Sequence, residues 1–212
     1  MNKKKIKSVK SISLILVIIC IASIFGGCSN NAEDSAMYIN VAQLNDDEQN
    51  IASLLGAGND HLIFDFIVDD TIKSVQVNTY RLVNGEWKLE SGGGGRTFED
   101  KHGRLALGFD KIPEGLRIAF QSENHGGADK FEADLQGIEL PTGCATTSLQ
   151  SETLIEYEKE IPLVIQVLTS QNAIKSYSVD CFETPEKYET ENYEYVYAIT
   201  IRFSQKTVNE LG

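Results

Sequence analysis

The chain has few of the side chains that build most catalytic and metal sites. It contains only three histidines, His61, His102 and His125, and no H-E-x-x-H or Cys-x-x-Cys pair. A zinc site is therefore not expected, because such sites combine several histidine or cysteine ligands at short spacings. The G-x-S-x-G turn that presents a serine nucleophile is also absent. We therefore expect a non-catalytic protein without a cofactor.

The remaining candidates for chemistry are weak, because loops rich in glycine and acidic residues produce similar clusters by chance. His125, Asp129 and Glu132 could place an imidazole and two carboxylates around a metal. The stretch His125-Gly126-Gly127 resembles the oxyanion loop of some esterases, but no nucleophile accompanies it. Residues 92–95 are four glycines followed by neither a lysine-serine pair nor a helical pattern, which indicates a loop or bulge.

Positive charge is scarce, with 19 lysines and arginines against 31 acidic residues and a net charge of −12. The first 27 residues hold five of these lysines, so the rest of the chain has 14 basic residues against 31 acidic ones, or −17. These 14 are scattered singly. Such a surface repels nucleic acids and anionic lipid headgroups, and we expect neither as a partner. It favours divalent cations, basic peptides or cationic glycans, although charge that merely keeps an exposed domain soluble explains it more simply.

The N-terminus combines a basic start with an apolar run. Five lysines precede Ser11, and the 17 residues from Ser11 to Gly27 carry no charge. This order is typical of a signal peptide, and the run also reaches the lower limit of about 17 to 25 residues for a membrane-spanning helix. Its end, Phe25-Gly26-Gly27-Cys28, resembles the lipobox of bacterial lipoproteins, with phenylalanine in place of the usual leucine.

By that resemblance, residues 1–27 are removed and Cys28 becomes the N-terminus, carrying a thioether-linked diacylglycerol. Two or three acyl chains anchor a protein stably where one does not. We expect a lipoprotein at the exported face of the cell membrane; the alternative is an uncleaved signal anchor. Cys20 does not fit, because bulky Ile18 and Ile19 precede it. The resemblance covers only the first 30 or so residues.

Residues 28–43 are interpreted as the lipidated cysteine and a polar tether, with the domain following at 44–212. Asn45 and Glu48 resemble a capping box, and Gly56 ends the pattern, so we expect a short helix at Asp46–Leu55. Apolar residues then alternate with a period of two, which predicts antiparallel strands. The expected strands are Leu62–Val68, Lys73–Val83, Glu86–Glu90, Arg104–Phe109, Leu116–Ser122 and Tyr193–Phe203.

The pattern as a whole predicts an all-β, antiparallel sandwich. Asn84-Gly85 is a strong hairpin signal, because both turn positions require a positive φ. IKSVQVNTY at Ile72–Tyr80 parallels IKSYSVDCF at Ile174–Phe182, and FDFI at 64–67 parallels IQVL at 165–168. This similarity suggests a duplicated strand-turn-strand unit in halves 60–125 and 150–205, joined through 123–151. The halves would form either one sandwich or two small β-domains.

Two further groups of residues are candidates for special roles. Cys144 and Cys181 form a candidate disulfide in an exported domain, with two separate thiols as the alternative. Trp87, Tyr188 and Tyr193 are candidate ligand-binding aromatics that would stack on a sugar if exposed, or ordinary packing residues if not. We therefore expect a binding or interaction module for an unknown ligand or protein at the cell surface. The alternatives are a small cell-envelope hydrolase and a structural subunit of a membrane complex.

Overall fold

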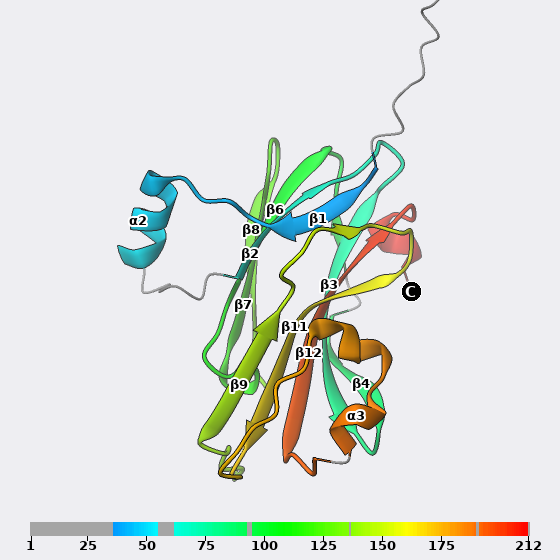
Figure 1. Ribbon diagram of the computed structural model, residues 1–212. Coiled ribbons are helices and arrows are strands. Elements are labelled where there is room, and N and C mark those ends of the chain that lie inside the picture. The colour runs from blue at the N-terminus through cyan, green and yellow to red at the C-terminus, as the bar shows by residue number, and fades with distance from the viewer. Residues whose placement is uncertain (1–35, 55–61, 93–94, 136, 190, 212) are drawn as a thin grey trace, which may run out of the picture. The chain divides into compact units, whose positions relative to one another are not determined.

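Two antiparallel β-sheets face each other in the part of the chain that the computed structural model describes, residues 36–54, 62–92, 95–135, 137–189 and 191–211 (Figure 1). The strands of the first sheet, sheet A, are in spatial order β10 (Thr153–Leu154), β1 (Tyr38–Val41), β2 (Leu62–Ile67), β6 (His102–Gly108), β7 (Leu116–Ser122) and β8 (Gly126–Phe131). Those of the second, sheet B, are β4 (Glu86–Ser91), β3 (Ser74–Val83), β12 (Tyr195–Ser204), β11 (Glu160–Thr169) and β9 (Gly143–Ser148), with β5 (Arg96–Thr97) also pairing with β3. The predicted all-β sandwich is confirmed.

The main core lies between the sheets, because each strand directs alternate residues inward. Phe64 and Phe66 of β2 and Leu105 of β6 meet Ile199 and Phe203 of β12 in one cluster of buried residues. The odd-numbered residues of the last strand therefore form its core face, as their alternation predicts. The ring of Phe66 lies at the centre of an aromatic group, with centroids 5.0 Å from Phe203, 5.3 Å from Phe98 and 6.4 Å from Phe120.

A second core covers the outer face of sheet B. Val196 and Ala198, on the even-numbered side of β12, pack with Ile165 and Val167 of β11. The connection between β11 and β12 closes this cluster through the 3-10 helix η2 (Val179–Glu183) and the short helix α3 (Glu186–Glu189). Because this connection covers it, the centre of sheet B is apolar on both faces. The outer face of sheet A has no second core of this kind among the described residues.

Local signals in the sequence correspond well to local structure. Asn84 and Gly85 have φ angles of 52° and 77° and join β3 to β4 in a tight hairpin, as predicted. The helix α2 (Asp46–Leu54) begins at the predicted capping box: the Asn45 and Glu48 side chains each accept the backbone N–H of the other residue, at 3.0 and 2.9 Å. It follows β1 rather than preceding all the strands. Two further 3-10 helices are η1 (Ile112–Glu114) and η3 (Val208–Glu210).

The N-terminal boundary of the domain is corrected by the structure. Residues 38–41, assigned to the tether, form β1 between β10 and β2. Ile39 is fully buried in the main core, so the sandwich begins before residue 44. A four-residue strand is too short for periodicity to reveal it. Residues 1–27 and Cys28 lie outside the described residues, within which no helix is long and apolar enough to cross a membrane.

The proposed duplication is also corrected. Ile72–Tyr80 largely forms β3, whereas Ile174–Phe182 forms no strand and enters η2. The expected junction at 123–151 contains β8 and β9, and the strands of the first half contribute to both sheets. The described residues from Ala36 onward form one compact unit. The similarity of the two stretches therefore reflects amphipathic composition rather than equivalent positions in the fold.

Candidate functional site

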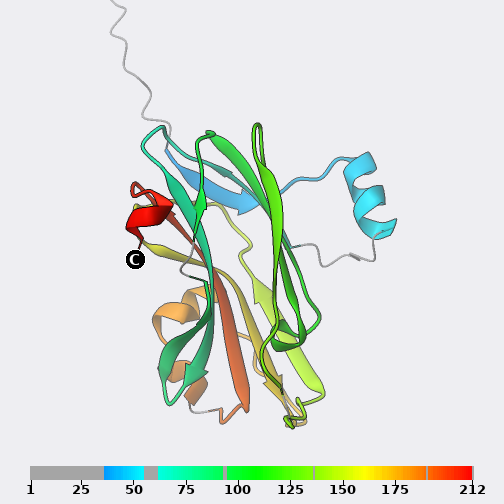
Figure 2. The same cartoon turned by 180° about the vertical axis from the view of Figure 1, so that it is seen from behind.

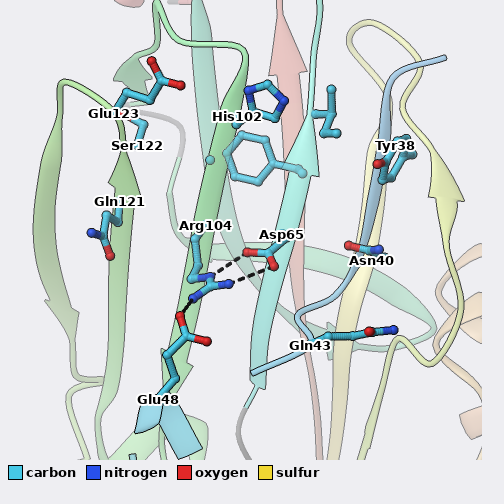
Figure 3. Close-up of a pocket in the computed structure, with 13 residues that line it drawn as sticks. Tyr38, Asn40, Gln43, Glu48, Asp65, His102, Arg104, Gln121, Ser122 and Glu123 are labelled. Atoms are coloured by element: carbon cyan, nitrogen blue, oxygen red, sulfur yellow. Dashed lines mark hydrogen bonds and ion pairs between the residues drawn. The ribbon is translucent and has the colours of Figure 1, made fainter. Parts of the chain in front are cut away.

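A hollow of about 800 Å³ lies over the outer face of sheet A, and we call it the trough (Figure 3). It crosses β1, β2, β6 and β7 and is bordered at one end by α2. Its lining consists of Tyr38, Asn40, Gln43, Glu48, Asp65, Phe66, Ile67, His102, Gly103, Arg104, Gln121, Ser122 and Glu123. The side chains that reach into it are therefore mainly polar.

The alternation of the strands explains this polarity. On β2, Phe64 and Phe66 are buried in the core, so Asp65 points outward. On β6, Leu105 points inward, which places Arg104 on the outer face directly opposite Asp65 in the antiparallel register. Helix α2 stands to one side of the strands in both views (Figures 1 and 2) and buries none of its own residues. The outer face of sheet A is thus left accessible.

Arg104 is the centre of the trough (Figure 3). Its Nε–H and Nη2–H groups donate to the two carboxylate oxygens of Asp65 at 2.6 and 3.0 Å, a bidentate arrangement. Its Nη1–H donates to Oε1 of Glu48 at 2.7 Å. The hydrogen bonds to Asp65, followed by those to Glu48, raise the pKa of Arg104 further above its already high value.

Glu48 connects this centre to α2. One carboxylate oxygen accepts the Asn45 N–H within the capping box, and the other accepts the Arg104 guanidinium. The backbone bond from Asn45, followed by the contact with Arg104, lowers the pKa of Glu48. The three charged side chains are about one third exposed, at 31% for Arg104, 37% for Glu48 and 39% for Asp65. The cluster is therefore held in place before any ligand arrives, yet it remains in contact with solvent.

Uncharged polar groups flank the cluster on both sides. Figure 3 shows Gln121 of β7 on one side of Arg104, and Asn40 and Tyr38 of β1 with Gln43 on the other. The dashed bonds in that view join Arg104 to Asp65 and Glu48, whereas these amides and the Tyr38 hydroxyl have none among the residues drawn. Each amide presents one acceptor oxygen and two N–H donors to the trough.

The floor of the trough depends on one close approach between strands. Gly103 of β6 lies opposite Phe66 of β2. A Cβ atom at Gly103 would lie only 2.2 Å from Cζ of Phe66, so the glycine leaves room for the ring. An aromatic ring that covers a cross-strand glycine stabilises the pair and excludes water from the backbone. The backbone beneath Arg104 is thereby fixed to the aromatic core.

The aromatic residues predicted to bind a ligand, Trp87, Tyr188 and Tyr193, do not line the trough and pack at the second core instead. Trp87 donates its Nε1–H to the Phe182 carbonyl at 2.9 Å and stacks on the Phe182 ring with centroids 5.1 Å apart. Tyr188 is 2% exposed and packs edge-on against Trp87 and Tyr177. Burial raises the pKa of Tyr188. These rings hold the β11–β12 connection to sheet B, and the burial of Tyr188 leaves that ring no exposed face for stacking on a sugar.

Tyr193 and the two cysteines also have other surroundings. Tyr193 is partly buried against the second core, and its hydroxyl accepts the Lys175 N–H at 2.8 Å. Cys144 on β9 is exposed and Cys181 in η2 is buried, and both are free thiols, so the candidate disulfide is not formed. The predicted lipidation site, Cys28, lies outside the described residues, as does His61.

The residues considered for a metal do not gather around one point. Asp129 pairs with Arg96, Glu132 pairs with Lys130, and His125 lies 3.6 Å from Asp100. Each carboxylate thus has a different partner. Within the described ranges, no group of three histidine, cysteine, aspartate or glutamate residues is placed to hold a metal ion.

Asp100, Ser122 and His125 bring together the three residue types of a hydrolase triad, but in the wrong order. The Ser122 hydroxyl donates to Asp100, and the imidazole approaches the same carboxylate, so no base faces the serine oxygen. Bonds from Ser122 and Asn124 lower the pKa of Asp100 to about 2. With a side chain only 6% exposed, Asp100 holds the turn between β7 and β8.

The trough was missed at the level of sequence because its members are distant along the chain. Asp65 and Arg104 are recognisable as a pair only once the register of β2 and β6 is known. The capping box was visible, but nothing in it indicates that Glu48 reaches a neighbouring sheet. No protein-family model, curated protein or solved structure matches this chain.

Proposed function

We propose that this chain is a lipid-anchored binding protein of the exported face of a bacterial cell membrane. Cys28 carries the lipid, the sandwich stands outside the membrane, and the trough binds a ligand without transforming it. The observation that carries the binding role is the trough itself, a preorganised charged centre with side-chain amides on both sides. A concave surface with a few convergent polar groups is the usual form of a binding site.

The non-catalytic part of the proposal is supported by the chemistry of the same residues. Arg104 and its two carboxylates are bonded to one another, so none of these three is a free base or nucleophile of the kind that a hydrolase requires. The serine that faces the trough, Ser122, donates its hydroxyl proton to Asp100. The arrangement is suited to recognition by hydrogen bonds.

The anchor is supported by the lipobox-like residues 25–28 and is tested by labelling with an alkyne-bearing fatty acid. The full chain is produced in a bacterium that processes lipoproteins, and labelled protein is detected after membrane fractionation. We expect the wild-type chain to carry the label in the membrane fraction and Cys28→Ala to lose both properties. Cys20→Ala is the matched control and should retain them. A label that persists in Cys28→Ala would refute the lipid anchor.

The binding role is tested separately by following a bound ligand over time. A ligand that raises the midpoint of thermal unfolding is incubated with the protein, and the mixture is analysed by chromatography. We expect the ligand to be recovered unchanged. Its conversion to smaller products would contradict the non-catalytic role and support a hydrolase.

A further inference from the structure

We infer that the trough binds an uncharged oligosaccharide, held by hydrogen bonds from the Asn40, Gln43 and Gln121 amides and from the Arg104–Asp65–Glu48 cluster. This inference rests on the proposed binding function and names its ligand class. It follows from comparing the lining with four kinds of ligand, namely anions, apolar molecules, cations and neutral polyols.

Anionic ligands are disfavoured by the charge of the lining. Arg104 is the one lysine or arginine among the residues that line the trough, whereas Glu48, Asp65 and Glu123 are acidic. Two of these carboxylates already hold the guanidinium. With His102 neutral, the lining carries a net charge of about −2, which repels an anion in addition to leaving it without a free cationic partner.

The trough exposes apolar as well as polar surface, so an apolar ligand is disfavoured by the polar groups rather than by a lack of apolar area. Phe66 belongs to the lining but is 1% exposed and packs into the core, which leaves Ile67 and Tyr38 as the other large apolar side chains of the lining. An apolar molecule would displace water from three amides and two carboxylates without replacing their hydrogen bonds. Each polar group left unpaired in this way costs free energy.

Cationic ligands satisfy only half of the available groups. An ammonium group is a donor, so it can pair with the carboxylate oxygens and the amide oxygens but not with N–H groups. The three amides supply two N–H donors each, and Arg104 uses three of its five N–H groups on Asp65 and Glu48. A cation would leave these donors without partners inside the complex.

A sugar hydroxyl can pair with both the donors and the acceptors of the lining, because it donates and accepts hydrogen bonds. One hydroxyl can donate to a carboxylate of the cluster and accept from an amide beside it. The four strands β1, β2, β6 and β7 span three strand spacings of about 4.8 Å, or roughly 14 Å, which suits a chain of several rings better than one ring. Tyr38, at one side of the trough, supplies an aromatic ring for the apolar face of a sugar.

The test uses the full chain in a detergent without a sugar headgroup, so that the detergent does not compete. The neutral probes are cellohexaose, xylohexaose, mannohexaose, maltohexaose and chitohexaose. Hexagalacturonate is the anionic comparison and hexalysine the cationic one. We expect at least one neutral probe to raise the midpoint of thermal unfolding by roughly 5 to 10 °C when present at about 100 times its dissociation constant.

Variants at amides of the lining locate the binding. Gln121→Ala and Asn40→Ala, on opposite sides of Arg104, should each weaken the neutral ligand by roughly two- to tenfold in calorimetric titration, since each removes about one hydrogen bond. Gln49→Ala, an exposed glutamine of α2 that does not line the trough, is the matched control and should bind as the wild type does. The dissociation constant of an uncharged ligand should also stay constant when salt is raised, whereas that of hexalysine should rise.

The outcomes separate this inference from the proposed function. If hexalysine or hexagalacturonate binds at the trough and the neutral probes do not, the ligand class is refuted and the binding role stands. If a neutral probe binds but neither trough variant weakens it, the assignment to the trough is refuted. If no probe of any class binds to the folded, lipidated chain, both proposals lose their support.

Discussion

Gly103→Ala is the sharpest test of how the floor of the trough is held. The added Cβ would lie 2.2, 2.6 and 2.9 Å from three carbon atoms of the Phe66 ring. That ring cannot move aside freely, because Phe98, Phe120 and Phe203 surround it. Replacing glycine by alanine also restricts the unfolded chain, which stabilises by about 0.4 to 1 kcal/mol where the site accepts a methyl group.

The clash should outweigh this entropic effect. Overpacking a well-packed core typically costs about 1 to 3 kcal/mol. We therefore expect Gly103→Ala to lower the free energy of unfolding, with a fall of up to roughly 10 °C in the thermal midpoint for a domain of this size. The assay is urea unfolding of residues 29–212, followed by the fluorescence of Trp87 and by circular dichroism.

Gly108→Ala is the matched control, because Gly108 lies on the same strand and a Cβ there would meet nothing within 4 Å. It should be neutral or slightly stabilising, whereas Gly103→Ala should be destabilising. Phe66→Leu should relieve the clash, and the double variant should show a coupling energy of about 0.5 to 3 kcal/mol. Equal effects of the two alanines, or strict additivity with Phe66→Leu, would refute the reasoning.

Three further predictions concern other parts of the fold. Asn45→Ala removes the cap of α2 and should destabilise that helix by about 1 kcal/mol. Because α2 buries no residue, hydrogen exchange should quicken in 46–54 while global unfolding in urea is unchanged. A lower midpoint of global unfolding would contradict this expectation. The pKa of Asp100 is lowered from 3.8 to about 2, so its contribution to stability is fully present above pH 4 and is lost as the pH falls towards 2. In thermal melts over that pH range, Asp100→Asn should therefore lose less stability than the wild type. Parallel curves of the thermal midpoint against pH for the two proteins would argue against this. The Tyr188 hydroxyl is buried and has no hydrogen-bond partner among the described residues, so Tyr188→Phe should raise the free energy of unfolding by roughly 1 kcal/mol. A clear loss of stability would show that the hydroxyl has a partner.

The strands that the sequence predicted well are long and amphipathic. β3, β7 and β12 were expected within one or two residues of their observed ends, because alternation over six or more residues is a strong signal. The short strands β1, β5 and β10, and the strands β8 and β9, were missed. Neither strand has a clear apolar alternation, since β8 is Gly-Gly-Ala-Asp-Lys-Phe and β9 is Gly-Cys-Ala-Thr-Thr-Ser, so pairing with a neighbouring strand places them in the sheets.

The exposure of the aromatic side chains was likewise not predictable from the sequence. Trp87 and Tyr188 were visible in the sequence, but whether such rings are exposed depends on what covers them. The β11–β12 connection folds back over sheet B, where it buries Tyr188 in the second core and partly buries Trp87 against it. Composition alone does not distinguish an exposed ring that is available to a ligand from one that its own chain covers.

The sequence by itself determined the elements whose physics is local: the alternation of the long strands, the Asn84-Gly85 turn with its positive φ angles, the Asn45–Glu48 capping box, and the scarcity of catalytic and metal-binding residues. Only the tertiary structure decided which face of each sheet is covered and which side chains meet there. Asp65 and Arg104 are 39 residues apart and Glu48 and Arg104 are 56 apart, so the trough exists only once strand pairing brings them together. A site built from cross-strand partners is set by register, and register depends on the packing of the whole sandwich.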